Sequence, residues 1–93
     1  MIQITERHMV GGRYHEHIAS VKWKEIGTGD IGENTRAQMV AWLDEDDAHK
    51  AIAGDYPNDY AYVGAVHPQL SNAYIRTYAD GDWTDNLLAL PEY

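Results

Sequence analysis

Cysteine and phenylalanine are absent from this chain of 93 residues, and basic residues are scarce, with 7 Lys and Arg against 15 Asp and Glu. Without cysteine, disulfide bonds, thiolate metal sites and a cysteine nucleophile are excluded. No apolar stretch approaches the roughly 18 residues that span a bilayer, and the first residues lack the basic flank and apolar run of a signal peptide. We therefore expect a soluble, cytoplasmic protein without a membrane segment.

The few basic residues are unevenly distributed along the chain. Residues 1–26 carry four basic and three acidic side chains, whereas residues 27–93 carry three basic and twelve acidic ones. A negative surface repels the phosphate backbone, which disfavours direct nucleic-acid binding. The same surface suits a basic protein partner, and it also serves solubility without any partner.

The aromatic residues are 7 Tyr and 3 Trp. Each of these side chains carries a polar group that must reach water or a hydrogen-bonding partner. This choice fits a thin protein whose core residues lie close to the surface. The chain length predicts one domain, residues 1–93, with one modest core.

Apolar and polar residues alternate in residues 1–10 and again in residues 14–24. A period of two is typical of strands that bury one face. Gly11-Gly12 lies between the two segments and is a turn signal, so we expect the segments to form a hairpin.

The middle of the chain predicts a loop and a helix. The stretch GTGDIGEN is rich in glycine and predicts the loop, and Thr35 and Gln38 after it have the T-x-x-Q spacing of a helix capping box. The apolar residues that follow predict a helix of about ten residues. The acidic run at residues 44–47 indicates a break, after which a short helical piece extends through Ala53.

Two further strands are predicted at residues 60–67 and 73–79, and Asp80-Gly81 after them is typical of a tight turn. The predicted order is strand, strand, helix, strand, strand. This order indicates the α+β class, with a small antiparallel sheet and one main helix packed on one face.

Three histidines are candidate metal ligands. His15 and His17 are two residues apart on a predicted strand, so we expect both on one face, where His8 of the paired strand is a third candidate. No carboxylate on a neighbouring element completes the set. The alternative is that these histidines are exposed or hydrogen-bonded near the turn, and we predict no cofactor.

Asp80, Asp82 and Asp85 resemble the start of a calcium-binding loop, but the twelfth position, which requires Glu, holds Pro91. Their structural interpretation is a turn followed by a capped segment. No serine lies in a G-x-S-x-G setting, and the glycines of GTGDIG lack the lysine of a phosphate-binding loop. The sequence therefore offers no catalytic residue, and we favour a protein that is not an enzyme.

Arg76 stands out among the basic residues because it lies inside a predicted strand, where Tyr74 and Tyr78 share its face. One interpretation is an internal ion pair with one of the nearby aspartates, which are Asp80, Asp82 and Asp85. The other interpretation is a binding site in which Arg76, Tyr74 and Tyr78 hold an anionic ligand.

The segment YIRTYADGDWTDNLLALPEY, residues 74–93, carries four short motifs, which are Arg76-Thr77, Asp80-Gly81, Asp85-Asn86-Leu87 and Leu90-Pro91. This pattern resembles the C-terminal part of an uncharacterised family, domain of unknown function 3892. The resemblance implies a bacterial or phage origin and no particular activity, because none is established for the family. It also implies a structural signature formed by Thr77, Asp80, Gly81, Asp85, Asn86, Leu87 and Pro91.

These features favour a small acidic accessory or interaction domain that binds a protein partner, in its sharper version a basic surface of a host protein. The alternative is a binder of a small anionic ligand, or an enzyme acting on one, that uses Arg76 with Tyr74 and Tyr78. Homodimer formation stays open, because the sequence does not identify an edge strand.

Overall fold

The computed structural model describes residues 1–93 and shows one mixed sheet of seven strands with one α-helix. The strand order is β3-β2-β1-β4-β5-β6-β7, and β1 pairs with β4 in parallel while all other neighbours are antiparallel. The helix α1 spans Arg36–Glu45, and a short 3-10 helix, η1, spans His15–His17. The strands are β1 (Ile2–Met9), β2 (Ile18–Glu25), β3 (Ile31–Thr35), β4 (Ala51–Asp55), β5 (Asp59–Val66), β6 (Tyr74–Ala79) and β7 (Asp82–Thr84).

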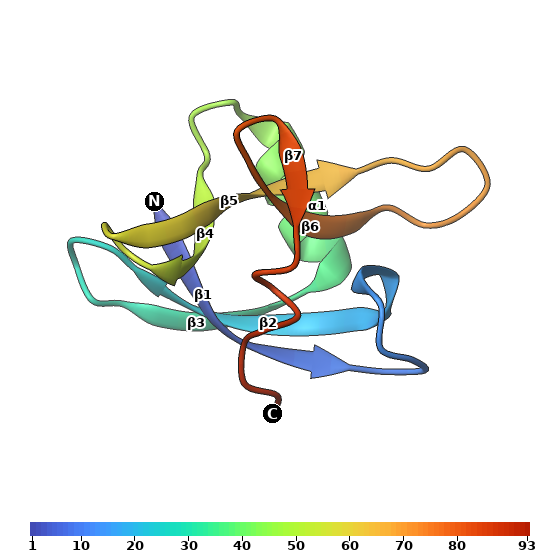
Figure 1. The fold of residues 1–93 in the computed structure, drawn as a ribbon, viewed down its shortest axis with the longest axis horizontal. Helices are drawn as coiled ribbons and strands as arrows, with labels where there is room; N and C mark the ends of the chain where they lie inside the picture. The colour runs from blue at the N-terminus through green and yellow to red at the C-terminus, as the bar shows by residue number, and fades with distance from the viewer.

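The sheet is curved around the helix. Figure 1 shows β1, β2 and β3 in the lower part of the molecule, β4 to β7 in the upper part, and α1 behind them. The helix contacts β2 and β3 from one end of the sheet and β5 and β6 from the other. The register of β1 against β2 shifts between Ile4 and Glu6 and again between His8 and Met9, and such bulges bend a strand and increase its twist.

The core lies between the curved sheet and α1. Ile4, Ile18, Met39 and Ile75 are at most 2% exposed, and Leu87, which follows β7, is fully buried in the same cluster. The C-terminal segment therefore contributes a core residue although it lies outside the strands and the helix.

The predicted α-helix and four predicted strands are confirmed. Thr35 and Gln38 form the expected capping box, in which the Thr35 side chain accepts from the Gln38 backbone N–H and the Gln38 side chain accepts from the Thr35 N–H. The segments predicted as strands at residues 1–10, 60–67 and 73–79 are β1, β5 and β6. The second strand of the hairpin begins later than predicted, because η1 occupies its first residues.

The prediction of a loop at GTGDIGEN was wrong in its second half, because Ile31–Thr35 forms β3 on the edge of the sheet. Gly32 has a packing reason to be glycine there. A Cβ atom at this position would lie 2.3 Å from Cζ2 of Trp23, so the indole ring covers the backbone of β3.

The prediction of a short helical piece through Ala53 was also wrong, because residues 46–50 form a turn and Ala51 begins β4. Ala51, Ile52 and Ala53 are all almost fully buried and pair in parallel with the start of β1. A strand covered on both faces shows no alternation of apolar and polar residues, so the sequence lacks the period-two pattern by which a strand is recognised. The expected four-stranded antiparallel sheet is therefore a seven-stranded mixed sheet.

Candidate functional site

The hairpin of β6 and β7 organises the C-terminal signature. Asp80 and Gly81 have φ angles of 53° and 83°, the left-handed values required by a two-residue hairpin turn, and Ala79 pairs with Asp82 directly beyond them. The predicted tight turn is confirmed. It adds β7 to the sheet, a strand that the sequence analysis did not predict.

Thr77 is the most fully hydrogen-bonded side chain of this hairpin. Its hydroxyl donates to the Thr84 carbonyl at 2.9 Å and accepts from the Thr84 hydroxyl at 2.8 Å and from the Asn86 N–H at 3.1 Å. Thr77 is fully buried. A single hydroxyl thus joins β6, β7 and the segment that follows, which gives the threonine a structural role. Asn86 contributes only its backbone N–H to this contact.

The end of the signature is fastened to β1 by Arg7. The Arg7 N–H donates to the Pro91 carbonyl and the Arg7 carbonyl accepts from the Tyr93 N–H, each at 3.0 Å. The Arg7 side chain adds a bond to the Leu90 carbonyl at 3.1 Å and an ion pair with Glu92 at 3.0 Å. The C-terminal segment therefore continues the sheet at the edge of β1, beyond the end of β4.

Arg76 lies on the opposite face of β6 from Thr77 and is held less completely. Its Nη2 atom is 3.4 Å from Oδ1 of Asp85, and its Nε atom is buried without a hydrogen-bonding partner. His15 from η1 approaches the same carboxylate, with Nε2 3.8 Å from Oδ1, and this Nε2 is also buried without a partner. Asp85 is the aspartate that pairs with Arg76, while Asp80 and Asp82 form the turn and β7.

The pKa of His15 is lowered from its usual value, first by burial and then by the positive charge of Arg76, and the nearby carboxylates of Asp85 and Glu16 oppose this change only in part. The neutral imidazole is therefore the favoured form in the folded protein. The three side chains His15, Arg76 and Asp85 form a cluster, which we call the His15–Arg76–Asp85 cluster.

The three candidate metal ligands are not brought together. His15 and His17 lie in η1 rather than on a strand, so the expectation that both point from one strand face was wrong. His15 is buried against Asp85, His17 accepts from the Tyr14 N–H, and His8 lies against Tyr93 at the C-terminal segment. No group of three His, Asp or Glu side chains is arranged to hold a metal ion.

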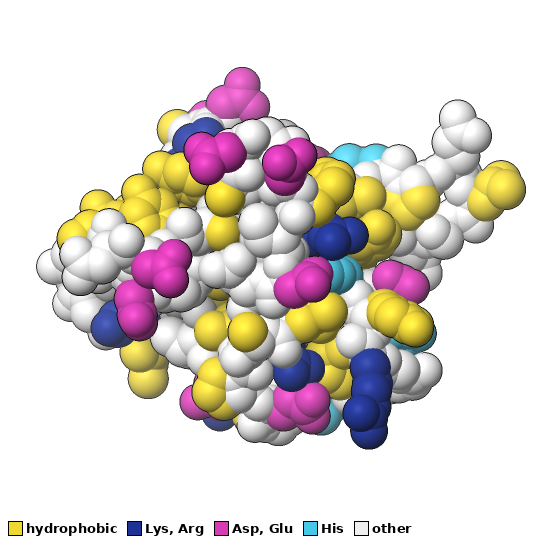
Figure 2. All heavy atoms as spheres, in the orientation of Figure 1, with side chains coloured by type: hydrophobic (Ala, Val, Ile, Leu, Met, Phe, Trp, Pro, Cys, Tyr) yellow, Lys and Arg dark blue, Asp and Glu magenta, His cyan; other side chains and the backbone are white.

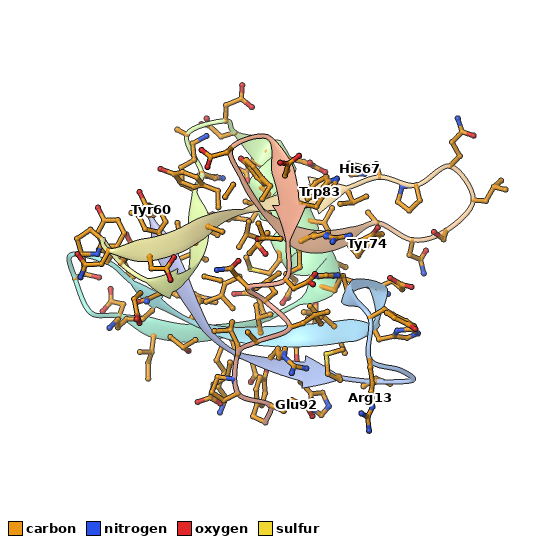
Figure 3. The ribbon with its side chains drawn as sticks, in the orientation of Figure 1. Arg13, Tyr60, His67, Tyr74, Trp83 and Glu92 are labelled. Carbon is orange, nitrogen blue, oxygen red and sulfur yellow. The ribbon has the colours of Figure 1, made fainter.

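Tyr74 and Tyr78 lie two residues before and after Arg76 on β6, and the two tyrosines have different neighbours. Tyr74 lines a pocket of about 420 Å³ between η1 and the loop that joins β5 to β6, together with Glu16 and Arg36. Figure 3 shows Tyr74 and His67 at the base of this loop, and Figure 1 shows the loop extending from the body of the molecule. Tyr78 instead packs against Tyr62 and Trp83.

Tyr78 belongs to a continuous row of aromatic rings across β5, β6 and β7, which we call the aromatic stripe. Consecutive ring centroids in it are 5.1, 5.7, 6.3 and 6.0 Å apart. Figure 3 labels Tyr60 on β5 and Trp83 on β7. In order, the stripe consists of Tyr56, Tyr60, Tyr62, Tyr78 and Trp83.

The stripe is exposed although its rings touch one another. Tyr56, Tyr62, Tyr78 and Trp83 are 37–51% exposed. Gly64 makes room for the stripe, because a Cβ atom there would lie 3.0 Å from the Tyr78 ring. The stripe also has a structural role, since Tyr62 pairs across the strands with Ile52, which is fully buried outside the main core cluster.

Exposed carboxylates lie at both ends of the stripe. Asp55 and Asp59 pair across β4 and β5 next to Tyr56 and Tyr60, and Asp80 and Asp82 lie at the turn before Trp83. Figure 2 shows hydrophobic side chains gathered over the upper left of this face, with acidic side chains beside them. The sequence alone places Tyr60 and Tyr62 on the same face of a strand, because they are two residues apart. Their proximity to Tyr78 and Trp83 comes from the pairing of β5 with β6 and of β6 with β7.

The family model described as "Protein of unknown function (DUF3892)" matches residues 3–91. The chain belongs to this family. The match includes nearly all of the chain. In the structure, residues 74–93 are held in place by Thr77, by the buried Leu87 and by the bonds to Arg7. No curated protein and no solved structure matches the chain.

None of the helices in this DUF3892 protein has the length and apolar character needed to cross a membrane.

Proposed function

We propose that this DUF3892 protein is an interaction domain whose aromatic stripe binds a basic segment of a partner protein. The observation that carries the proposal is the row of five touching aromatic rings, four of them more than a third exposed, with a pair of carboxylates at each end. Exposed aromatic residues are enriched at protein interfaces, and contiguous apolar patches mark binding surfaces.

The chemistry of the stripe favours basic side chains as its ligands. A guanidinium or ammonium group is attracted to the face of an aromatic ring, and a neighbouring carboxylate adds an ion pair. The protein already contains this arrangement, because the guanidinium of Arg76 lies over the Trp83 ring with its Cζ atom 5.8 Å from the ring centroid. The net charge of −8 would attract such a partner over a distance. A second copy of the chain would present the same carboxylates, so charge disfavours it as the occupant.

An arginine–glycine repeat peptide and its glutamate–glycine counterpart are the probes for a test by calorimetry and NMR. We expect saturable binding of the basic peptide alone, with the largest amide shifts in β5, β6 and β7. Trp83→Ser should weaken binding about tenfold or more, as the loss of a central aromatic side chain does at interfaces. Tyr14→Ser is the matched control, because Tyr14 is 69% exposed and lies outside the stripe.

The carboxylates need a second pair of variants. The double change Asp80→Asn with Asp82→Asn should weaken binding and reduce its dependence on salt, whereas Asp47→Asn, at an exposed position beyond α1, should change neither. Equal weakening by the stripe variants and by the controls would mean that the peptide responds only to net charge. That result, or the absence of saturable binding, would overturn the proposal.

A further inference from the structure

In the His15–Arg76–Asp85 cluster, the two side chains that approach the Asp85 carboxylate each keep a buried nitrogen without a partner. Nε2 of His15 and Nε of Arg76 have no hydrogen-bonding partner, and the side chain of His15 is only 7% exposed. Buried polar groups in folded proteins are almost always hydrogen-bonded. Each of these two neighbouring side chains therefore has a nitrogen that forms no hydrogen bond within the protein.

Asp85 bonds weakly to both side chains. Its Oδ1 atom is 3.4 Å from Nη2 of Arg76 and 3.8 Å from Nε2 of His15, and both distances exceed those of good charge-assisted hydrogen bonds. The Asp85 side chain is 75% exposed, so the carboxylate is well hydrated and loses little when it turns away. The backbone of the next residue is anchored separately, because the Asn86 N–H donates to Thr77.

We propose that Arg76 and His15 form a binding site for a small oxyanion, of the carboxylate or phosphate class, and that the Asp85 carboxylate occupies the ligand's position in its absence. The guanidinium offers planar donors that match two oxygen atoms of such a group. The His15 Nε2 atom donates a further bond when it carries the proton.

Neighbouring groups pack against both donor side chains. The Arg76 guanidinium lies over the Trp83 ring, and its strand is held on its other face by Thr77. His15 is part of η1, which packs against β6. The site therefore needs only the exposed Asp85 side chain to move. Tyr74 and Tyr78, which the sequence analysis placed beside Arg76 in an anion site, lie in a neighbouring pocket and against Tyr62 and Trp83, respectively.

Inorganic phosphate and acetate are the probes for the test, titrated separately at constant ionic strength and neutral pH. NMR follows the imidazole resonances of His15 and the amides of β6. Asp85→Asn removes the competing charge and should tighten binding about tenfold or more. Asp47→Asn, which removes the same charge at an exposed position beyond α1, should change the dissociation constant less than about twofold. Arg76→Gln should abolish binding, and Arg76→Lys, which keeps the charge but loses the planar donors, should weaken it.

The two probes distinguish the source of the ligand. Shifts with phosphate alone indicate a phosphate group, whereas shifts with both probes indicate that carboxylates bind as well. Dispersed amide spectra establish that each variant is folded before it is titrated. The proposal is overturned when neither wild type nor Asp85→Asn shows a saturable change at His15, or when Arg76→Gln binds as well as wild type.

Discussion

Arg76 and Thr77 are neighbours on β6, but their side chains lie on opposite faces of the strand and differ in burial and in hydrogen bonding. Thr77 is fully buried and its hydroxyl makes three hydrogen bonds of 2.8–3.1 Å. The Arg76 side chain is 30% exposed, has one bond of 3.4 Å to Asp85, and keeps a buried nitrogen without a partner. On the inner face of β6 the Thr77 hydroxyl is thus fully hydrogen-bonded, while on the outer face Arg76 keeps a nitrogen that the protein does not use.

The comparison predicts first that Thr77→Val has the larger effect on stability. Valine keeps the shape but leaves the Thr84 hydroxyl and the Asn86 N–H without their partner, and an unsatisfied buried group costs about 1–3 kcal/mol. We expect the free energy of unfolding to fall by that amount in a denaturant titration. Thr77→Ser keeps the hydroxyl, so its free energy of unfolding should fall by less than half as much as that of Thr77→Val.

Arg76→Ala is predicted to have the smaller effect. An ion pair with a partner as exposed as Asp85 contributes less than about 1 kcal/mol, and the substitution also removes an unpaired buried nitrogen. The same denaturant titration measures it. A loss equal to that of Thr77→Val would show that Arg76 is a structural residue, and the contrast between the two faces would fail.

The smallest effect concerns pH. Because the pKa of His15 is lowered in the folded protein, the unfolded chain takes up this proton first as pH falls below about 6.5. The free energy of unfolding therefore decreases toward acidic pH through His15. His15→Gln should lose less stability than wild type between about pH 7.5 and pH 5. Parallel pH profiles for the two proteins would contradict the lowered pKa, and the same profiles with phosphate present would show whether an anion restores stability.

Local signals in the sequence predicted the elements whose ends are marked by side chains. The capping box at Thr35 and Gln38 marks the start of α1, and Asp80-Gly81 marks the turn between β6 and β7. These features depend on residues within four positions of one another. β4 was not predicted because its three consecutive buried residues show no alternation of apolar and polar side chains. β3 was not predicted because its glycine-rich surroundings indicated a loop, whereas the Trp23 ring packs over Gly32 in the strand.

The candidate sites depended more strongly on tertiary structure. The sequence singled out Arg76, and Asp85 was among its expected partners. His15 was interpreted as a metal candidate on a strand, whereas the 3-10 helix η1 turns it toward Asp85. The aromatic stripe joins residues from Tyr56 to Trp83, and no spacing in the sequence reveals that their rings are in contact.

By itself, the sequence determined the acidity of the protein, the helix, four of its strands and the Asp80-Gly81 turn, because each follows from composition or from neighbours along the chain. Only the tertiary structure decided the parallel pairing of β1 with β4, the bonds from Arg7 to the C-terminal segment, and the meeting of His15 with Arg76. These contacts join residues 49 to 86 positions apart, as for Ile2 with Ala51, or Arg7 with Tyr93. Their formation depends on how the sheet curves around α1, through the bulges of β1 and the packing of the core, and neither is visible as a pattern in the sequence.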